Sequence, residues 1–198
     1  MLLPTRIGKP KPLPRGNIAT YFPAARWLPD GRSFVVSGTE SGRKSRVFLQ
    51  AIDGGDPRPI TPEGAYGRLT VLPGGTSFVT RGVDRRLTIY SLSNAEPRVV
   101  AGTLAGDLPV TASPDGEWLL VQSDTDLPAQ IVRINLRSGR REAVRSLVPP
   151  DPAGVMNILR VVATPDAKWY AYTFVRALSS LYIVDGLNRR TVADIFSR

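Results

Sequence analysis

Apolar runs of strand length alternate along this chain with tight-turn residues. Four tetrapeptides place proline second and aspartate or glycine after it: Leu28-Pro29-Asp30-Gly31, Leu72-Pro73-Gly74-Gly75, Ser113-Pro114-Asp115-Gly116 and Thr164-Pro165-Asp166-Ala167. Proline presets φ at the second position, aspartate accepts the third, and glycine accepts a positive φ at the fourth, so each tetrapeptide predicts a turn between strands. Ala167 does not accept a positive φ readily, and we expect the fourth turn to have a different shape.

The same series of strands is expected around each turn. A second strand, rich in β-branched and aromatic residues, follows it at 33–37, 77–80, 118–122 and 169–174. A third strand follows after a short gap, at 46–51, 87–91, 130–135 and 181–185. An inner strand precedes the turn, as at 68–72 and 159–163. Three units end in an outer strand whose prolines or charges suit a sheet edge, at 57–60, 97–100 and 141–144.

Four strands in a repeat of roughly 40–50 residues are typical of a β-propeller blade. We therefore predict an all-β chain that forms one β-propeller domain over residues 1–198, a partial or small propeller with four recognisable four-stranded blades. The blades are expected at about 24–61, 67–101, 108–147 and 157–187, followed by a tail at 189–198. Almost no helix is expected, because no window has helical spacing and 18 prolines and 18 glycines interrupt the chain.

How the ring closes is left open by the sequence. The last unit lacks an evident outer strand, whereas residues 8–14 resemble one and precede the first blade. If residues 8–14 pair with residues 181–184, the ring is closed by joining its two ends, and both exposed sheet edges disappear. If the ring stays open, the unpaired edge predicts self-association.

Two absences from the composition remove much enzyme chemistry. The chain has no cysteine and no histidine. Disulfides, thiolate metal sites and thiol nucleophiles are therefore excluded, as is the usual base of a Ser-His-Asp triad. The serines at 91, 93, 179 and 180 have no neighbouring base in the sequence. We expect no catalytic residues, no metal and no cofactor.

The net charge of +9 comes mainly from arginines that are scattered along the sequence. Arg85-Arg86, Arg140-Arg141 and Arg189-Arg190 fall in predicted turns or at the terminus, where a solvated charge is the expected interpretation. A basic nucleic-acid interface is the alternative, although such interfaces usually concentrate charge and aromatic residues in one patch. We do not expect nucleic acid as the partner.

Two other groups of residues could bind a ligand. Asp30, Asp115 and Asp166 recur by unit and are interpreted as turn formers rather than calcium ligands. The loop 124–126 (Asp-Thr-Asp) could share a cation, but it lacks the glycine and distal glutamate of a calcium loop, so we interpret it as surface.

Three tryptophans could form a stacking platform for a sugar or a base. Trp27 precedes its turn, whereas Trp118 and Trp169 begin the second strand of their units. Aromatic side chains contribute strongly to core packing, so the latter two are expected between adjacent blades.

The repeat resembles the TolB-like, WD-like propeller repeat. The residues that carry the resemblance are Trp27-Leu28-Pro29-Asp30-Gly31 and Ile60-Thr61-Pro62-Glu63-Gly64. More narrowly, segments 13–18, 57–64, 151–155, 170–172 and 178–187 are similar to the C-terminal propeller of large acidobacterial Ser/Thr protein kinases. The resemblance departs at Ala167 and after Asn188.

That resemblance implies the non-catalytic, sensory or scaffolding part of a kinase whose catalytic domain lies elsewhere. This chain has no glycine-rich loop followed by a lysine strand, no His-Arg-Asp and no Asp-Phe-Gly. We expect a non-catalytic propeller that binds a protein, a peptide or a small ligand. The alternatives are a propeller that accompanies a separate peptidase domain, a catalytic propeller, a nucleic-acid binder and an inactive genomic remnant.

The residues leave the cell compartment open. The first six are too short and too soon interrupted by proline for a signal peptide, and no apolar stretch is long enough for a membrane span. The sequence therefore predicts a soluble chain, cytoplasmic by default and periplasmic if it belongs to a kinase receptor.

Overall fold

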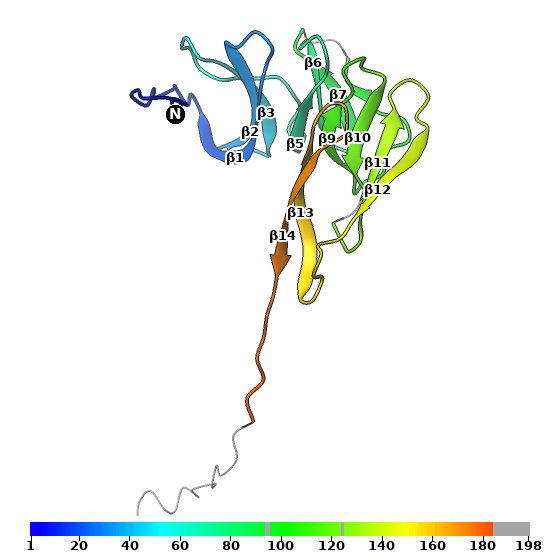
Figure 1. Ribbon diagram of the computed structural model, residues 1–198. Coiled ribbons are helices and arrows are strands. Elements are labelled where there is room, and N and C mark those ends of the chain that lie inside the picture. The colour runs from blue at the N-terminus through cyan, green and yellow to red at the C-terminus, as the bar shows by residue number, and fades with distance from the viewer. Residues whose placement is uncertain (94–95, 124, 184–198) are drawn as a thin grey trace, which may run out of the picture.

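The computed structural model describes residues 1–183 except 94–95 and 124, and these residues form antiparallel sheets arranged as a fan (Figure 1). The first sheet contains β1 (Ile18–Trp27), β2 (Ser33–Glu40), β3 (Arg46–Ala51) and β4 (Arg58–Pro59). The second contains β5 (Tyr66–Val71), β6 (Ser77–Arg81), β7 (Leu87–Ser91) and β8 (Arg98–Val99). The third contains β9 (Leu108–Ala112), β10 (Trp118–Gln122), β11 (Ala129–Asn135) and β12 (Arg141–Leu147). The fourth contains β13 (Val155–Ala163) and β14 (Tyr170–Arg176).

The predicted all-β propeller class is confirmed, and the described residues contain no helix. Over residues 1–183, however, the fourth sheet has two strands rather than the predicted four. Its expected third strand at 181–185 is not formed at residues 181–183, and the rest of that prediction lies outside the described residues, as does the tail at 189–198. Beyond β14 the described chain leads away from the sheets (Figure 1).

The four proline turns share one hydrogen-bond pattern, although the second turn also has a positive φ of 84° at Gly74, its third residue. In the first turn Leu28 donates its N–H to the carbonyl of Ser33 at 2.9 Å, and Gly31 donates to that of Leu28 at 3.1 Å. The fourth repeats this pattern, with Ala167 donating to the carbonyl of Thr164 at 2.8 Å. Ala167 has a φ of 54°, so the expectation of a different shape is wrong: alanine adopts the conformation that glycine has elsewhere.

The core lies between neighbouring sheets. The sixth residue after the proline of one turn packs against the fifth residue after the next proline, as Val35 packs with Phe78 and Val79 with Leu119. Leu120 packs in the same way against Tyr170 of the fourth sheet. Burial of each such side chain contributes about 1.5–3 kcal/mol. Each sheet is therefore stabilised by its neighbours rather than by a core of its own.

The N-terminal segment lies against the first sheet. Leu2 and Lys11 form a bridge, with N–H to carbonyl distances of 2.8 and 2.9 Å, and Gln50 donates its side-chain N–H to the carbonyl of Pro14 at 2.8 Å. Residues 8–14 consequently do not pair with residues 181–183, and Val184 lies outside the described residues. The predicted closure by joining the two ends is absent from the described structure.

None of the described residues builds a helix long and apolar enough to cross a bilayer.

Candidate functional site

The inner strands of the four sheets, β1, β5, β9 and β13, lie next to one another around a common axis (Figure 1). At one end of this axis the four proline turns meet around a cavity of about 440 Å³. We call this cavity the proline mouth; its lining comprises Trp27, Leu28, Pro29, Val71, Leu72, Pro73, Thr111, Ala112, Pro114 and Pro165. The turns approach closely, since a Cβ atom on Gly75 would lie 2.5 Å from Cδ of Pro29. The mouth is therefore an open depression between closely spaced turns, and its lining is mostly apolar.

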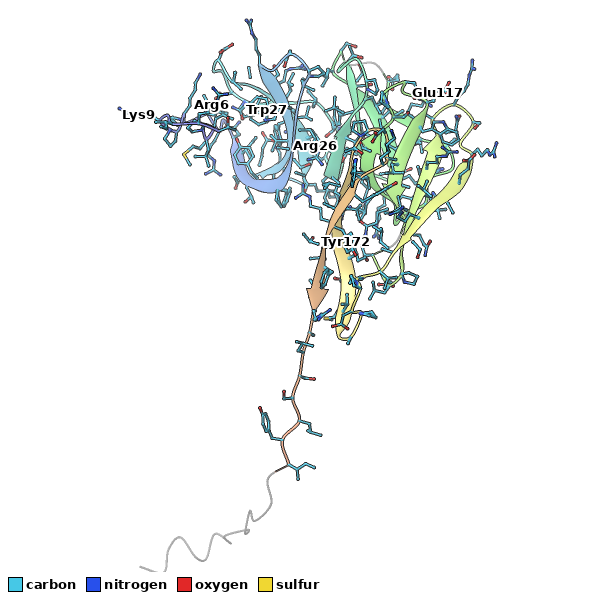
Figure 2. All side chains as sticks on the ribbon, in the orientation of Figure 1. Arg6, Lys9, Arg26, Trp27, Glu117 and Tyr172 are labelled. Carbon is cyan, nitrogen blue, oxygen red and sulfur yellow. The ribbon has the colours of Figure 1, made fainter. Side chains whose placement is uncertain are left out.

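Three arginines on these same strands carry charges that act on one another. Arg68 on β5 and Arg160 on β13 each stand five residues before their turn proline, and Arg26 on β1 stands three before its own. We call them the axial arginines. With a strand rise of about 3.3 Å per residue, they lie roughly 10–17 Å along the strands from the prolines. Figure 2 places Arg26 between the first sheet and the inner strands of the others.

Hydrogen bonds fix Arg68 between the second, third and fourth sheets. Its Nη1 donates to Oε1 of Gln122 on β10 at 2.8 Å, and its Nη2 donates to the carbonyl of Leu159. Gln122 is fully buried and donates its Nε2 to the carbonyl of Ile158 at 2.8 Å. Three sheets thus hold the Arg68 guanidinium in one orientation.

The electrostatics of the cluster are unfavourable in the absence of an anion. Burial, and then the charges of Arg160, Arg26 and Arg81, lower the pKa of Arg68 to about 10. Burial, and then the charge of Arg160, also lower the pKa of Arg26. Nε of Arg81 is buried and has no hydrogen-bond partner.

The axial arginines have no acidic counterpart in the described part of the chain. Every ion pair found there involves other basic residues. A pKa of about 10 leaves Arg68 protonated at neutral pH. Partly desolvated positive charge without a counterion is costly, and carboxylate or phosphate oxygens are the groups that arginine forks bind best. The arrangement is suited to holding an anionic group.

This cluster was not predicted from the sequence, in which the arginines are scattered and were expected to be solvated. A signal was present: Arg68 and Arg160 occupy the same position relative to their turn prolines. The prediction that Arg141 is a solvated turn residue is also wrong. Its guanidinium binds the carboxylate of fully buried Asp107 at 2.5 and 3.2 Å and Oγ of Ser123 at 2.9 Å. Arg85 does lie in an exposed turn, and Arg189-Arg190 lie outside the described residues.

The recurring aspartates are turn formers, as predicted. Oδ1 of Asp30 accepts the N–H groups of Arg32 and Ser33, each at 2.9 Å. Asp115 and Asp166 accept equivalent backbone bonds and also bind the hydroxyl groups of Ser113 and Thr164. These bonds lower the pKa of all three carboxyl groups.

The other candidate residues do not form one site. Within the described residues no three Asp or Glu side chains gather at a distance suited to a metal ion, and Asp124 lies outside them. Trp118 is covered by the guanidinium of Arg133, 4.4 Å from its ring centre, and Trp169 is 75% exposed. The expectation that these two rings pack between blades is wrong, because the residue after each of them, Leu119 or Tyr170, points into the junction. Trp27 alone reaches the mouth.

Comparisons with known proteins support the propeller fold. No known protein family matches the sequence. An uncharacterised protein of Agrobacterium fabrum is 32% identical over 123 residues, which are 59% of this chain and 41% of that protein. This chain thus spans less than half the length of that curated relative.

Solved structures with the same fold are more distant in sequence. A structure assigned to TolB of Agrobacterium tumefaciens matches with a TM-score of 0.62 at 20% identity, covering 86% of this chain and 61% of the other. TolB of Acinetobacter baumannii matches at 0.56 and 13%, covering 80% and 44%. Oligogalacturonate lyase of Vibrio parahaemolyticus matches at 0.50 and 14%, covering 71% and 42%. These similarities show a TolB-like propeller fold.

Proposed function

We propose that this chain is a non-catalytic binding module whose axial arginines hold an anionic group of a protein or peptide partner. The observation that carries the proposal is the cluster of Arg26, Arg68 and Arg160, in which Arg26 and Arg68 are half-buried, Arg160 is exposed, and none has a carboxylate partner among the described residues. A carboxylate bound there would gain charge-assisted hydrogen bonds and would reduce the repulsion among the three guanidinium groups.

A peptide fits the geometry better than a nucleic acid does. The axial arginines lie on inner strands between sheets and not along an open stripe that could follow a phosphate backbone. The proline mouth, at the turn end of the same strands, is open and mostly apolar, with a volume of about 440 Å³. A short segment with apolar residues beside an acidic side chain or a terminal carboxylate would match both features. A small anionic ligand could bind the same arginines.

Several observations support a binding role without catalysis. The charged residues of the cluster are arginines, which at neutral pH can donate hydrogen bonds but cannot act as a general base. The chain also supplies no histidine or cysteine. A role as the sensory or scaffolding part of a kinase-like receptor follows from the sequence resemblance alone and stays part of this proposal.

Titration with labelled peptides tests the proposed site. The probe is a pool of fluorescein-labelled heptapeptides that contain Leu, Pro, Asp and Glu, compared with the same pool carrying Asn and Gln in place of the acids. We expect the acidic pool to bind and the neutral pool not to bind. The double variant Arg26→Gln/Arg160→Gln should weaken binding by about tenfold or more, since a charge-assisted hydrogen bond contributes about 1.5–3 kcal/mol.

The matched control removes the same charge elsewhere. Arg58 and Arg137 are exposed and lie on the outer strand of the first sheet and in a turn of the third. The variant Arg58→Gln/Arg137→Gln should bind the acidic pool as the parent does. Equal weakening by both double variants would show that only net charge matters, and tighter binding of arbitrary duplex DNA than of peptides would favour the nucleic-acid alternative.

A further inference from the structure

Each junction between neighbouring sheets is built from the same two faces. The incoming face of a sheet presents the fifth residue after its proline, such as Phe78, Leu119 or Tyr170. The outgoing face of the sheet before it presents the sixth, such as Val35, Val79 or Leu120. All three junctions bring these positions together in apolar clusters. The chain therefore contains a repeated and self-complementary packing surface.

The incoming face of the first sheet has no sheet packed on it. Phe34 occupies the position of Phe78 and Leu119, and it packs with residues of its own sheet, namely Trp27 and the cluster of Ile18, Val36 and Phe48. A groove of about 640 Å³ remains on this face, lined mainly by apolar atoms of residues that include Tyr21, Trp27, Phe34 and Val36.

The N-terminal segment covers this face only in part. Leu2, Pro12 and Leu13 line one side of the groove, whereas Leu3 and Ile7 point into solvent. The segment is held by the Leu2–Lys11 bridge and by the bond from Gln50 to Pro14. It forms a rim at one side, and the groove beside Phe34 stays open.

The outgoing face of the fourth sheet is also unpartnered within the described residues. Ala171 occupies the position of Val35, Val79 and Leu120, and its cross-strand neighbour is Val162, which is 45% exposed. Val175 extends the same face of β14 and is also exposed. Within the described residues, the fan therefore begins with an incoming face and ends with an outgoing face on which no other sheet is packed.

We propose that two copies of this chain associate head to tail, with the fourth sheet of each copy packed on the first sheet of the other. The two unpartnered faces present the same positions after the turn proline that pack together at the three junctions within the chain, so they can form a fourth junction of the same kind between copies. In a closed pair each copy provides one outgoing and one incoming face, so assembly stops at two chains. Two sets of four sheets give eight, within the range of about 4–8 blades known for propellers.

Light scattering coupled to size-exclusion chromatography tests the pairing on the full chain. We expect a mass of two chains at micromolar concentration and above. A single-chain mass at every concentration, or an open series of larger oligomers, would overturn the closed pair.

Two variants separate loss of the interface from loss of folding. Phe34→Asp alters the incoming face and Val162→Asp the outgoing face, and each alone should shift the chain to the single-chain mass. A mixture of the two variants retains one unmodified junction, formed by the first sheet of the Val162→Asp chain and the fourth sheet of the Phe34→Asp chain. The mixture should therefore recover two-chain mass, whereas misfolded variants would not.

The control introduces the same charge away from both faces. Val144 on β12 is 39% exposed and lies on the outer strand of the third sheet. Val144→Asp should leave the two-chain mass unchanged, and loss of pairing in this variant would contradict the assigned faces. Arg26 lines this groove and is also one of the axial arginines, so the Arg26→Gln/Arg160→Gln variant is measured by light scattering as well as by peptide titration. Weakened peptide binding with an unchanged two-chain mass separates the two proposals.

Discussion

Ala167 occupies, in the fourth proline turn, the position that glycine holds in the other three. Its φ of 54° resembles the 73° of Gly116 in the third turn, although an L-residue other than glycine is strained there. A Cβ on Gly116 would meet only Pro73 at 3.9 Å, an ordinary contact. An alanine at position 116 would therefore be disfavoured by the positive φ of the backbone and not by lack of space.

Exchanging the residues at these two positions should change stability in opposite directions. Ala167→Gly should raise the free energy of unfolding by about 0.5–1 kcal/mol, because relief of the strained φ exceeds the entropy cost of glycine. Gly116→Ala should lower it by about 1 kcal/mol for the converse reason. Urea unfolding followed by circular dichroism measures both, and equal signs for the two variants would contradict the explanation.

At the scale of strands and sheets, stability resides in the junctions. Phe78 on β6 is fully buried between the first and second sheets and stacks with Tyr90, with ring centres 5.8 Å apart. Phe34 on β2 has the same place in its repeat but no neighbouring sheet, and its main aromatic contact is Trp27 at 5.4 Å. The same residue type at the same position is therefore fully buried in one sheet and only partly buried in the other.

Alanine substitution at these two phenylalanines measures what a neighbouring sheet contributes. Phe78→Ala should cost about 3–5 kcal/mol, as is usual for a buried phenylalanine. Phe34→Ala should cost about 1 kcal/mol or less when the chain is dilute enough to be unpaired, because less apolar area leaves solvent contact there. Thermal unfolding at low protein concentration compares them, and similar losses would indicate that Phe34 is already covered within one chain.

For the molecule as a whole, lowering the pH should reduce the free energy of unfolding in two ways: by protonating the turn aspartates and by increasing the net positive charge. The pKa values of Asp30, Asp115 and Asp166 are lowered by hydrogen bonds formed in the folded state. A lowered folded-state pKa contributes stability that is present above the unfolded pKa of about 3.9 and is lost as pH falls through the folded value. Protonation of carboxylates also increases a net charge that is already +9 and strengthens self-repulsion.

Melting temperature should therefore fall between pH 5 and pH 2, through the region of about 3.9 where aspartates titrate. Asp115→Asn retains an oxygen that can accept the bonds from Ser113 and Glu117 but cannot titrate. This variant should lose less stability than the parent over the same range. An unchanged pH profile would show that the turn carboxylates contribute nothing to acid sensitivity.

Local sequence patterns were enough to predict the repeat: the positions of the turns, most of the strands, and the side-by-side packing of the sheets. These follow from local preferences, since proline, aspartate and glycine fix a turn within four residues, and alternation assigns the two faces of a strand. The third strand expected at 181–185 is the exception, because residues 181–183 form no strand. Ala167 adopts the positive φ that the turn requires, although alanine prefers a negative φ, because the pairing of β13 with β14 and the turn hydrogen bond hold its backbone in this conformation.

Contacts between charged residues that are far apart in the sequence could be identified from the tertiary structure alone. Arg141 finds Asp107, and Arg68 approaches Arg26 and Arg160, because each pair or group lies on strands that become neighbours only when the sheets assemble around the axis. The exposure of Trp169 and the presence of two strands in the fourth sheet over the described residues also depend on how the sheets pack. Local patterns carry no information on such contacts, since they depend on the angle and register at which one sheet packs on the next.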